Sequence, residues 1–129
     1  MNYLLTLVKK FLQDAAEFYP VGAFMNIDGK MNSMAGYDGR ENPPSDEIIQ
    51  IITQGFIEGA KDGSFKATAL AYDALVTDPD TGSKDDAIAI ALDHRQNYSV
   101  VVHFRYRMHQ GLPILEPPTA SPGARQIFR

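Results

Sequence analysis

The feature that most constrains the fold is an alternation of apolar and polar side chains from Tyr98 to His109. Successive side chains of a β-strand point to opposite faces of the sheet, so this period of two indicates a long, half-buried strand. One face carries Tyr98, Val100, Val102, Phe104, Tyr106 and Met108. The other face carries Ser99, Val101, His103, Arg105, Arg107 and His109. The first set requires a hydrophobic core, whereas the second set forms a polar, basic face.

Two further strand-like runs precede this one, at residues 66–77 and 86–93. The short polar loops DPDTGS and HRQN connect the three runs, which favours an antiparallel meander. The HRQN turn would pair Leu92 with Val100. This register predicts the further pairs Ile90–Val102, Ile88–Phe104, Ala89–His103 and Ala87–Arg105.

The basic face should adjoin a flat surface of small side chains. We expect the alanines of the first two runs to line up there: Ala67, Ala69, Ala71, Ala87 and Ala89. Asp73 should lie on the same face, near His103 or Arg105. Two interpretations stay open. Either the second helix lays its Gly55 and Gly59 side over the alanines, or the surface receives a partner or a ligand.

A helix and a hairpin are expected at the start of the chain. Apolar residues at three-and-four spacing predict an amphipathic helix over residues 4–18, which Pro20 ends. Its apolar stripe is Leu4, Val8, Phe11, Ala15 and Phe18, and Leu5, Leu12 and Tyr19 widen it. A hairpin follows over residues 21–34, because Asp28-Gly29 is a pair that a two-residue type I′ turn prefers.

The second helix is predicted from Asp46 to Lys61, with Ser45 as its N-cap and Gly63 just past its end. The last nineteen residues contain four prolines and no helical period. They predict an extended tail whose end, RQIFR, can dock on the body. The fold class is therefore α+β, with one antiparallel sheet of about five strands and two main helices in the order α-β-β-α-β-β-β. We assign residues 1–110 to a single domain and residues 111–129 to the proline-rich C-terminal tail.

This order of elements over residues 3–109 resembles the profilin-like and roadblock/longin-like α/β folds, in which an antiparallel sheet lies between helices. The final packed helix of those folds is missing here. The segment EFYPVGAFMNIDGK also resembles the opening of small bacterial proteins that have no assigned activity. The first resemblance implies a fold type often used by adaptors, and neither supplies a site residue.

Composition restricts the compartment and the partners. The 129 residues carry a net charge of −4, with an isoelectric point near 5.2, which argues against generalised binding to nucleic acid or to an anionic membrane. The absence of cysteine excludes disulfides, thiolate catalysis and cysteine-type zinc sites, and it fits the cytoplasm. Lys9 and Lys10 interrupt the first apolar run, so no secretory signal or membrane span is expected.

No metal site is expected from the histidines. His103 and His109 are six residues apart on one strand, or roughly 20 Å at about 3.3 Å per residue, which is too far for a shared metal ion. The loop DPDTGSKDD offers Asp78 and Asp80, but it lacks the glycine and the final glutamate that an EF-hand loop requires.

The sequence also lacks other patterns that carry chemistry. Ser99 should pair with Asp93, while His103 lies about 13 Å along the strand, so a Ser-His-Asp triad is not expected. Neither GxxxxGK[ST] nor GxGxxG occurs. The aromatics of the last strand lie opposite its arginines, which argues against a base-stacking RNA sheet.

We therefore expect no catalytic residue, no cofactor and no metal ion. The leading interpretation is a non-enzymatic protein-interaction module, cytoplasmic and bacterial, that forms a homodimer or binds another protein. Its candidate interaction surface is His103, Arg105, Arg107, His109 and Asp73.

Two alternatives stay open. An immunity-type protein could inhibit a toxin partner through acidic residues such as Asp78, Asp80, Asp85 and Asp86. A small-molecule-binding protein or unrecognised enzyme could have a pocket between the first helix and the sheet. That pocket would lie near Tyr19, Tyr72, Tyr98 and Tyr106.

Overall fold

The computed structural model describes residues 1–15, 18–35, 45–77, 80–96 and 98–128. Its helices are α1 (Asn2–Ala15) and α2 (Ser45–Lys61). Its strands are β1 (Val21–Asn26), β2 (Met31–Ala35), β3 (Phe65–Thr77), β4 (Lys84–His94), β5 (Tyr98–His109), β6 (Leu112–Leu115) and β7 (Thr119–Pro122). The α+β class and the single antiparallel sheet are confirmed, but the described chain has seven strands in that sheet rather than about five.

The strand order is β2-β1-β3-β4-β5-β6, and β7 also pairs with β5. Strands β3, β4 and β5 form the predicted meander, and Leu92 pairs with Val100. The other predicted pairs between β4 and β5 are present as well: Ile90–Val102, Ile88–Phe104, Ala89–His103 and Ala87–Arg105. The short HRQN turn therefore sets the register as expected.

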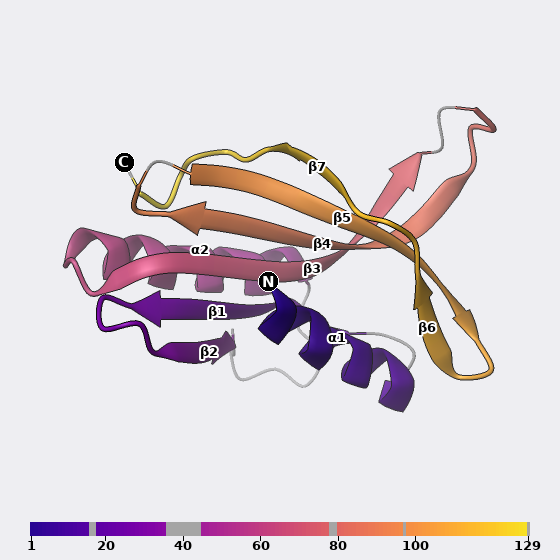
Figure 1. The fold of residues 1–129 in the computed structure, drawn as a ribbon, viewed down its shortest axis with the longest axis horizontal. Helices are drawn as coiled ribbons and strands as arrows, with labels where there is room; N and C mark the ends of the chain where they lie inside the picture. The colour runs from indigo at the N-terminus through magenta and orange to yellow at the C-terminus, as the bar shows by residue number, and fades with distance from the viewer. Residues whose placement is uncertain (16–17, 36–44, 78–79, 97, 129) are drawn as a thin grey trace.

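The two helices cover opposite faces of the sheet, with α1 in front of it and α2 behind it in Figure 1. We call these the α1 face and the α2 face. The core of the α1 face includes Leu4, Val8, Leu12, Ile88, Ile90 and Phe104. The core of the α2 face includes Ile48, Ile52, Phe56, Phe65, Leu70 and Ile127.

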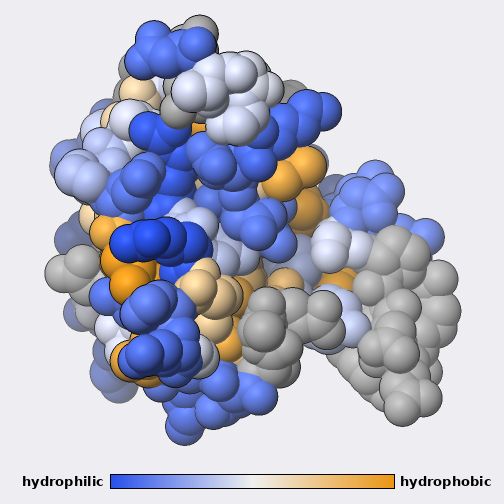
Figure 2. Space-filling view, turned by 90° about the vertical axis from the view of Figure 1, so that its right-hand side faces the viewer, coloured by the Kyte–Doolittle hydropathy of each residue, from blue (hydrophilic) through white to orange (hydrophobic). Residues whose placement is uncertain are grey.

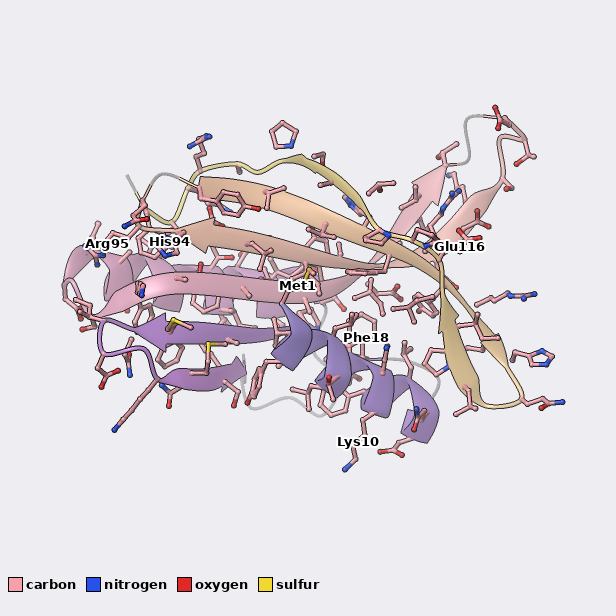
Figure 3. The ribbon with its side chains drawn as sticks, viewed as in Figure 1. Met1, Lys10, Phe18, His94, Arg95 and Glu116 are labelled. Atoms are coloured by element: carbon pink, nitrogen blue, oxygen red, sulfur yellow. The ribbon has the colours of Figure 1, made fainter. Side chains whose placement is uncertain are left out.

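The buried stripe of α1 agrees with the predicted one at Leu4, Val8 and Leu12. Phe11, which we expected to face the core, is instead 37% exposed. Phe18 is buried but lies outside the helix, which is described only as far as Ala15. Figure 3 shows Phe18 beside α1 and the sheet, while Lys10 points away from both.

The alanine surface was predicted wrongly. Residues directly opposite each other in an antiparallel pair share a face, and Ala71 pairs with Ile90 while Tyr72 pairs with Ala89. The β3 alanines Ala67, Ala69 and Ala71 therefore lie on the α1 face, and the β4 alanines lie on the α2 face. The register across the β3–β4 loop differs by one residue from the expected one, and a shift of one residue exchanges the faces.

The glycines of α2 do not pack on those alanines. A Cβ atom at Gly59 would collide with the ring of Phe65, and one at Gly55 would lie 3.0 Å from the Sδ atom of Met34. The helix ends as predicted, because Gly63 has a φ of +81°. The Ser64 N–H donates to the Gly59 carbonyl in the hydrogen-bond pattern of a Schellman motif.

The first hairpin has a longer turn than expected. The Asn26 N–H donates to the Lys30 carbonyl, and the Gly29 N–H donates to the Asn26 carbonyl, both at 2.9 Å. The loop therefore contains Ile27, Asp28 and Gly29, with Gly29 at a φ of +90°. A type I turn followed by a glycine in the left-handed region gives this three-residue connection.

Residues 112–122 form β6 and β7 instead of an extended tail. Gln110 and Gly111 both have positive φ, at 52° and 78°, as a two-residue type I′ turn between β5 and β6 requires. The Glu116 N–H donates to the Arg105 carbonyl at 2.8 Å, after which β7 pairs with Val100 to His103. Ile127 is then buried against α2 and β3, so the end of the chain lies on the body.

The sheet divides at one end into two protruding ribbons (Figure 1). Pairing between β4 and β5 ends at Ala87 and Arg105. Beyond this point β3 and β4 continue together, and β5 continues with β6. We call residues 74–77 and 84–86 the β3–β4 arm and residues 106–115 the β5–β6 arm.

Candidate interaction surface

The structure places four of the five predicted surface residues on one face of β5. His103, Arg105, Arg107 and His109 all point to the α2 face of β5, as their alternation predicts. Asp73 is opposite Ile88 and therefore lies on the α1 face. Its predicted position beside His103 or Arg105 was wrong, for the same one-residue register difference that moved the alanines.

Arg105 is held by two carboxylates. Its Nε lies 3.1 Å from Oε2 of Glu116, and its Nη1 lies 3.8 Å from Oδ2 of Asp85. Asp85 belongs to the β3–β4 arm, and Glu116 follows β6 (labelled in Figure 3), so Arg105 links the two arms where they diverge. The charge of Arg105 is therefore largely balanced within the chain.

Sequence reasoning missed Glu116 because the proline-rich segment was expected to leave the body. The signal that could have found it is Gln110-Gly111. A glycine after a polar residue between two apolar runs favours a tight hairpin, which returns the chain along β5.

The outer face of the β5–β6 arm combines basic and aliphatic side chains. Arg107 is opposite Ile114, and His109 is opposite Leu112. Leu112 is 54% exposed and Ile114 is 39% exposed. The other face of this arm carries Tyr106, Met108 and Leu115, which pack against the α1 core. One face of the arm is thus anchored while the opposite face meets solvent.

The β3–β4 arm has the opposite arrangement of charge. Leu75 is opposite Asp86 on the α1 face and is 66% exposed, with Asp73 two residues before it. Burial and the negative charge of Asp86 raise the pKa of the Asp73 carboxyl above its usual value. The Tyr106 hydroxyl lies 3.5 Å from Oδ1 of Asp73, and burial together with this carboxylate raises the pKa of Tyr106.

Seen from the side of the arms, the surface is mostly hydrophilic with small, separate hydrophobic areas (Figure 2). Isolated exposed apolar residues are ordinary on a protein surface. Among the described residues, Asp86 and Arg107 form no ion pair, and each lies opposite an exposed apolar side chain on its arm.

A cavity lies between α2 and the segment at residues 123–128, which we call the C-terminal strap. Its volume is about 320 Å³, and its floor includes Leu70, Tyr72, Ala91 and Asp93. Burial raises the pKa of the Asp93 carboxyl, and a hydrogen bond from Ser99 opposes part of that shift. The Arg125 N–H donates in turn to the Ser99 hydroxyl oxygen at 3.2 Å, which ties the strap to β5.

The four tyrosines of the expected ligand pocket do not converge. Tyr72 lies on the α2 face and Tyr106 on the α1 face. Tyr19 and Tyr98 are 43% and 56% exposed. A pocket made by these residues between α1 and the sheet is therefore not formed.

At the opposite end of the sheet, the Arg95 side chain has a structural role. The Nη2 and Nε atoms of Arg95 donate to the Phe65 carbonyl at 2.8 and 3.1 Å, and its guanidinium lies 5.7 Å from the centre of the Phe128 ring. The neighbouring His94 accepts the Gln96 N–H through Nδ1 at 3.0 Å. Both side chains thus hold the β4–β5 turn (Figure 3).

Among the described residues, no group of three histidine, aspartate or glutamate side chains is arranged to hold a metal ion. Asp78, one of the acidic residues considered for calcium or for a toxin partner, lies outside the described residues. Within the part of the chain that the structure covers, neither helix is long and apolar enough to span a membrane. Comparison with protein-family models, with curated proteins and with solved structures finds no match in any of the three.

Proposed function

We propose that this chain is a non-enzymatic protein-interaction module that binds its partner through the outer face of the β5–β6 arm. The observation that carries the proposal is the pairing of Arg107 with Ile114 and of His109 with Leu112 on an exposed face. Aliphatic side chains beside a basic residue supply apolar area, and the charge orients the partner.

The spacing of the basic residues along the α2 face of β5 favours binding over catalysis. His103 and His109 are about 20 Å apart at the usual rise of a strand, so they are not placed to act on one substrate. Arg105, which lies between them, is occupied by Asp85 and Glu116. The order of elements over residues 3–109 resembles profilin-like and roadblock-like folds, and this analogy supports an adaptor role.

The test is gentle purification of the tagged chain from its own host, followed by native mass spectrometry. We expect the intact chain to carry an additional protein, either another chain or a second copy. We expect this mass to be lost when Arg107 and His109 are both replaced by Glu, because the exposed face would then repel the same partner.

The matched control is Lys10→Glu, which reverses a charge on the exposed side of α1, where the side chain points away from the sheet. It should leave the additional mass in place. A monomeric mass for the unmodified chain, or a complex that the double replacement leaves intact, would contradict the proposal.

A second candidate function is small-molecule binding in the cavity between α2 and the strap. The observation that favours it is a half-buried carboxylate, Asp93, beside the apolar floor made by Leu70 and Ala91. The volume, about 320 Å³, is at the lower end of the range for ligand pockets. A retained mass of a few hundred daltons that Ala91→Phe removes would support this candidate.

A further inference from the structure

We infer that the partner of the β5–β6 arm is the β3–β4 arm of a second copy of this chain. The inference rests on the proposed function, because it adds the identity of the partner to the surface proposed above. Its basis is that the two arms of one chain carry complementary surfaces that cannot meet within that chain.

The first surface is acidic and aliphatic. Asp73, Leu75 and Asp86 share the α1 face of β3 and β4, and Leu75, at 66%, is the most exposed large apolar residue of the described chain. Lys84 lies on the same face at the tip of the arm, opposite Thr77. Within the described part of the chain, neither Asp73 nor Asp86 forms an ion pair, and each repels the other. A cation placed near both carboxylates would relieve this repulsion.

The second surface is basic and aliphatic. Arg107 lies next to Ile114 on the α2 face of the β5–β6 arm, and Leu112 extends the apolar area toward the turn. Arg105 is not available to a partner in the same way, because Glu116 and Asp85 already neutralise it. Arg107 is therefore the cation of this arm that a second copy would meet.

The two surfaces point away from each other. One lies on the α1 face and the other on the α2 face, and the arms diverge from the body as they extend (Figure 1). Two copies related by a two-fold axis can form both contacts, because the acidic arm of each copy then meets the basic arm of the other. Such an isologous dimer contains two equal contacts and leaves neither surface open.

The inferred contact is tested with charge-reversal variants. Their dimerisation is measured by sedimentation velocity at protein concentrations between about 1 and 500 µM, a range that covers modest affinities. We expect the unmodified chain to dimerise. We expect Arg107→Glu and Asp86→Lys each to weaken dimerisation by about tenfold or more, because like charges then face each other.

Mixing the two variants is the decisive step. In a mixed dimer, one contact joins the new Glu to the new Lys, and the other joins the original Asp to the original Arg. We expect the mixture to recover dimerisation to within about threefold of the unmodified chain, since charge pairs of either polarity are equivalent to first order. Lys10→Glu serves as the control, and circular dichroism checks that each variant keeps its fold.

A monomer at every concentration, or an equal dimer in all single variants, overturns the inferred contact. Failure of the mixture to recover does the same when both variants are folded. If the unmodified chain is monomeric but binds a different host protein that Arg107→Glu releases, the self-association is wrong while the proposed function stands. If no complex of any kind depends on Arg107, both are wrong.

Discussion

The two faces of the sheet are buried by different means. On the α1 face, the helix packs directly on the body of the sheet, and its fully buried side chains meet Ile88 and Ile90. On the α2 face, the helix contacts β1, β2 and β3, while the C-terminal strap lies over β4 and β5 and inserts one buried side chain, Ile127. A cavity remains between the helix and the strap. Most of the largest fully buried side chains of the described chain belong to the α1 core, so we infer that the α1 face supplies most of the stability.

The largest effect is expected for removing apolar volume from the α1 face. Ile88 is fully buried, so Ile88→Ala should lower the free energy of unfolding by about 3 kcal/mol through lost transfer energy and the cavity left behind. Urea denaturation followed by circular dichroism measures the change. Ile27→Ala is the matched control, because Ile27 is 63% exposed in the first hairpin and should change stability by less than about 0.5 kcal/mol. Equal effects at the two positions would contradict the burial of Ile88 in the core of the α1 face.

An intermediate effect is expected inside α2, where two glycines test how closely this face is packed. Gly59→Ala places a methyl group against the ring of Phe65, which is buried, and should destabilise the protein by about 1–3 kcal/mol. Gly55→Ala meets only the flexible end of Met34 at 3.0 and 3.4 Å. Its gain in helix propensity, about 1 kcal/mol, should leave the protein equally or more stable.

The two replacements are compared by their urea midpoints under identical conditions. A stabilising Gly59→Ala would mean that the Phe65 ring moves aside easily, so that α2 is loosely packed at its C-terminal end. A strongly destabilising Gly55→Ala would mean that the helix is tightly packed along this whole side.

The difference between the faces also explains which parts of the fold could be predicted from the sequence. Alternation along β5 assigned each of its side chains to the correct face, because one face is anchored in the hydrophobic core of the α1 face. The HRQN turn is short enough to fix the register of β4 against β5. The β3–β4 loop is longer, and an error of one residue placed Asp73 and the β3 alanines on the wrong face.

The C-terminal strands were missed for another physical reason. Proline cannot donate to a sheet, and residues 111–129 contain four of them, so local propensity argues against strands there. Their pairing depends on β5, which offers a long unpaired edge that sequence reasoning did not assign to any partner. The ion pairs of Arg105 were missed with them, since Glu116 reaches Arg105 only when the chain returns along that edge. The position of the basic side chains on one face of β5 was therefore predictable, whereas the neutralisation of Arg105 by Asp85 and Glu116 was not.

The smallest expected effect concerns the polar group under the strap. Burial raises the pKa of Asp93 above its usual value, so the folded state binds a proton more readily than the unfolded state does. Stability therefore falls as the pH rises from the usual pKa of an aspartate, 3.8, through the raised pKa of the folded state. Asp93→Asn removes the charge and keeps an oxygen that can accept the Ser99 hydroxyl. It should raise stability at pH 7 by less than about 1 kcal/mol, since solvent screens a half-exposed carboxylate.

The pH profile separates this effect from a general change in packing. The advantage of Asp93→Asn should shrink as the pH is lowered toward 3, where the carboxyl of the unmodified chain is protonated in both states. Urea midpoints at several pH values measure this difference, with Asp14→Asn on the exposed side of α1 as the control. Asp73, whose pKa is raised on the other face, titrates in both chains and cancels in the comparison. A loss of stability at pH 7 would instead mean that the Asp93 carboxylate holds the strap in place through Ser99 and Arg125. The charge, rather than Ile127 alone, would then close the α2 face.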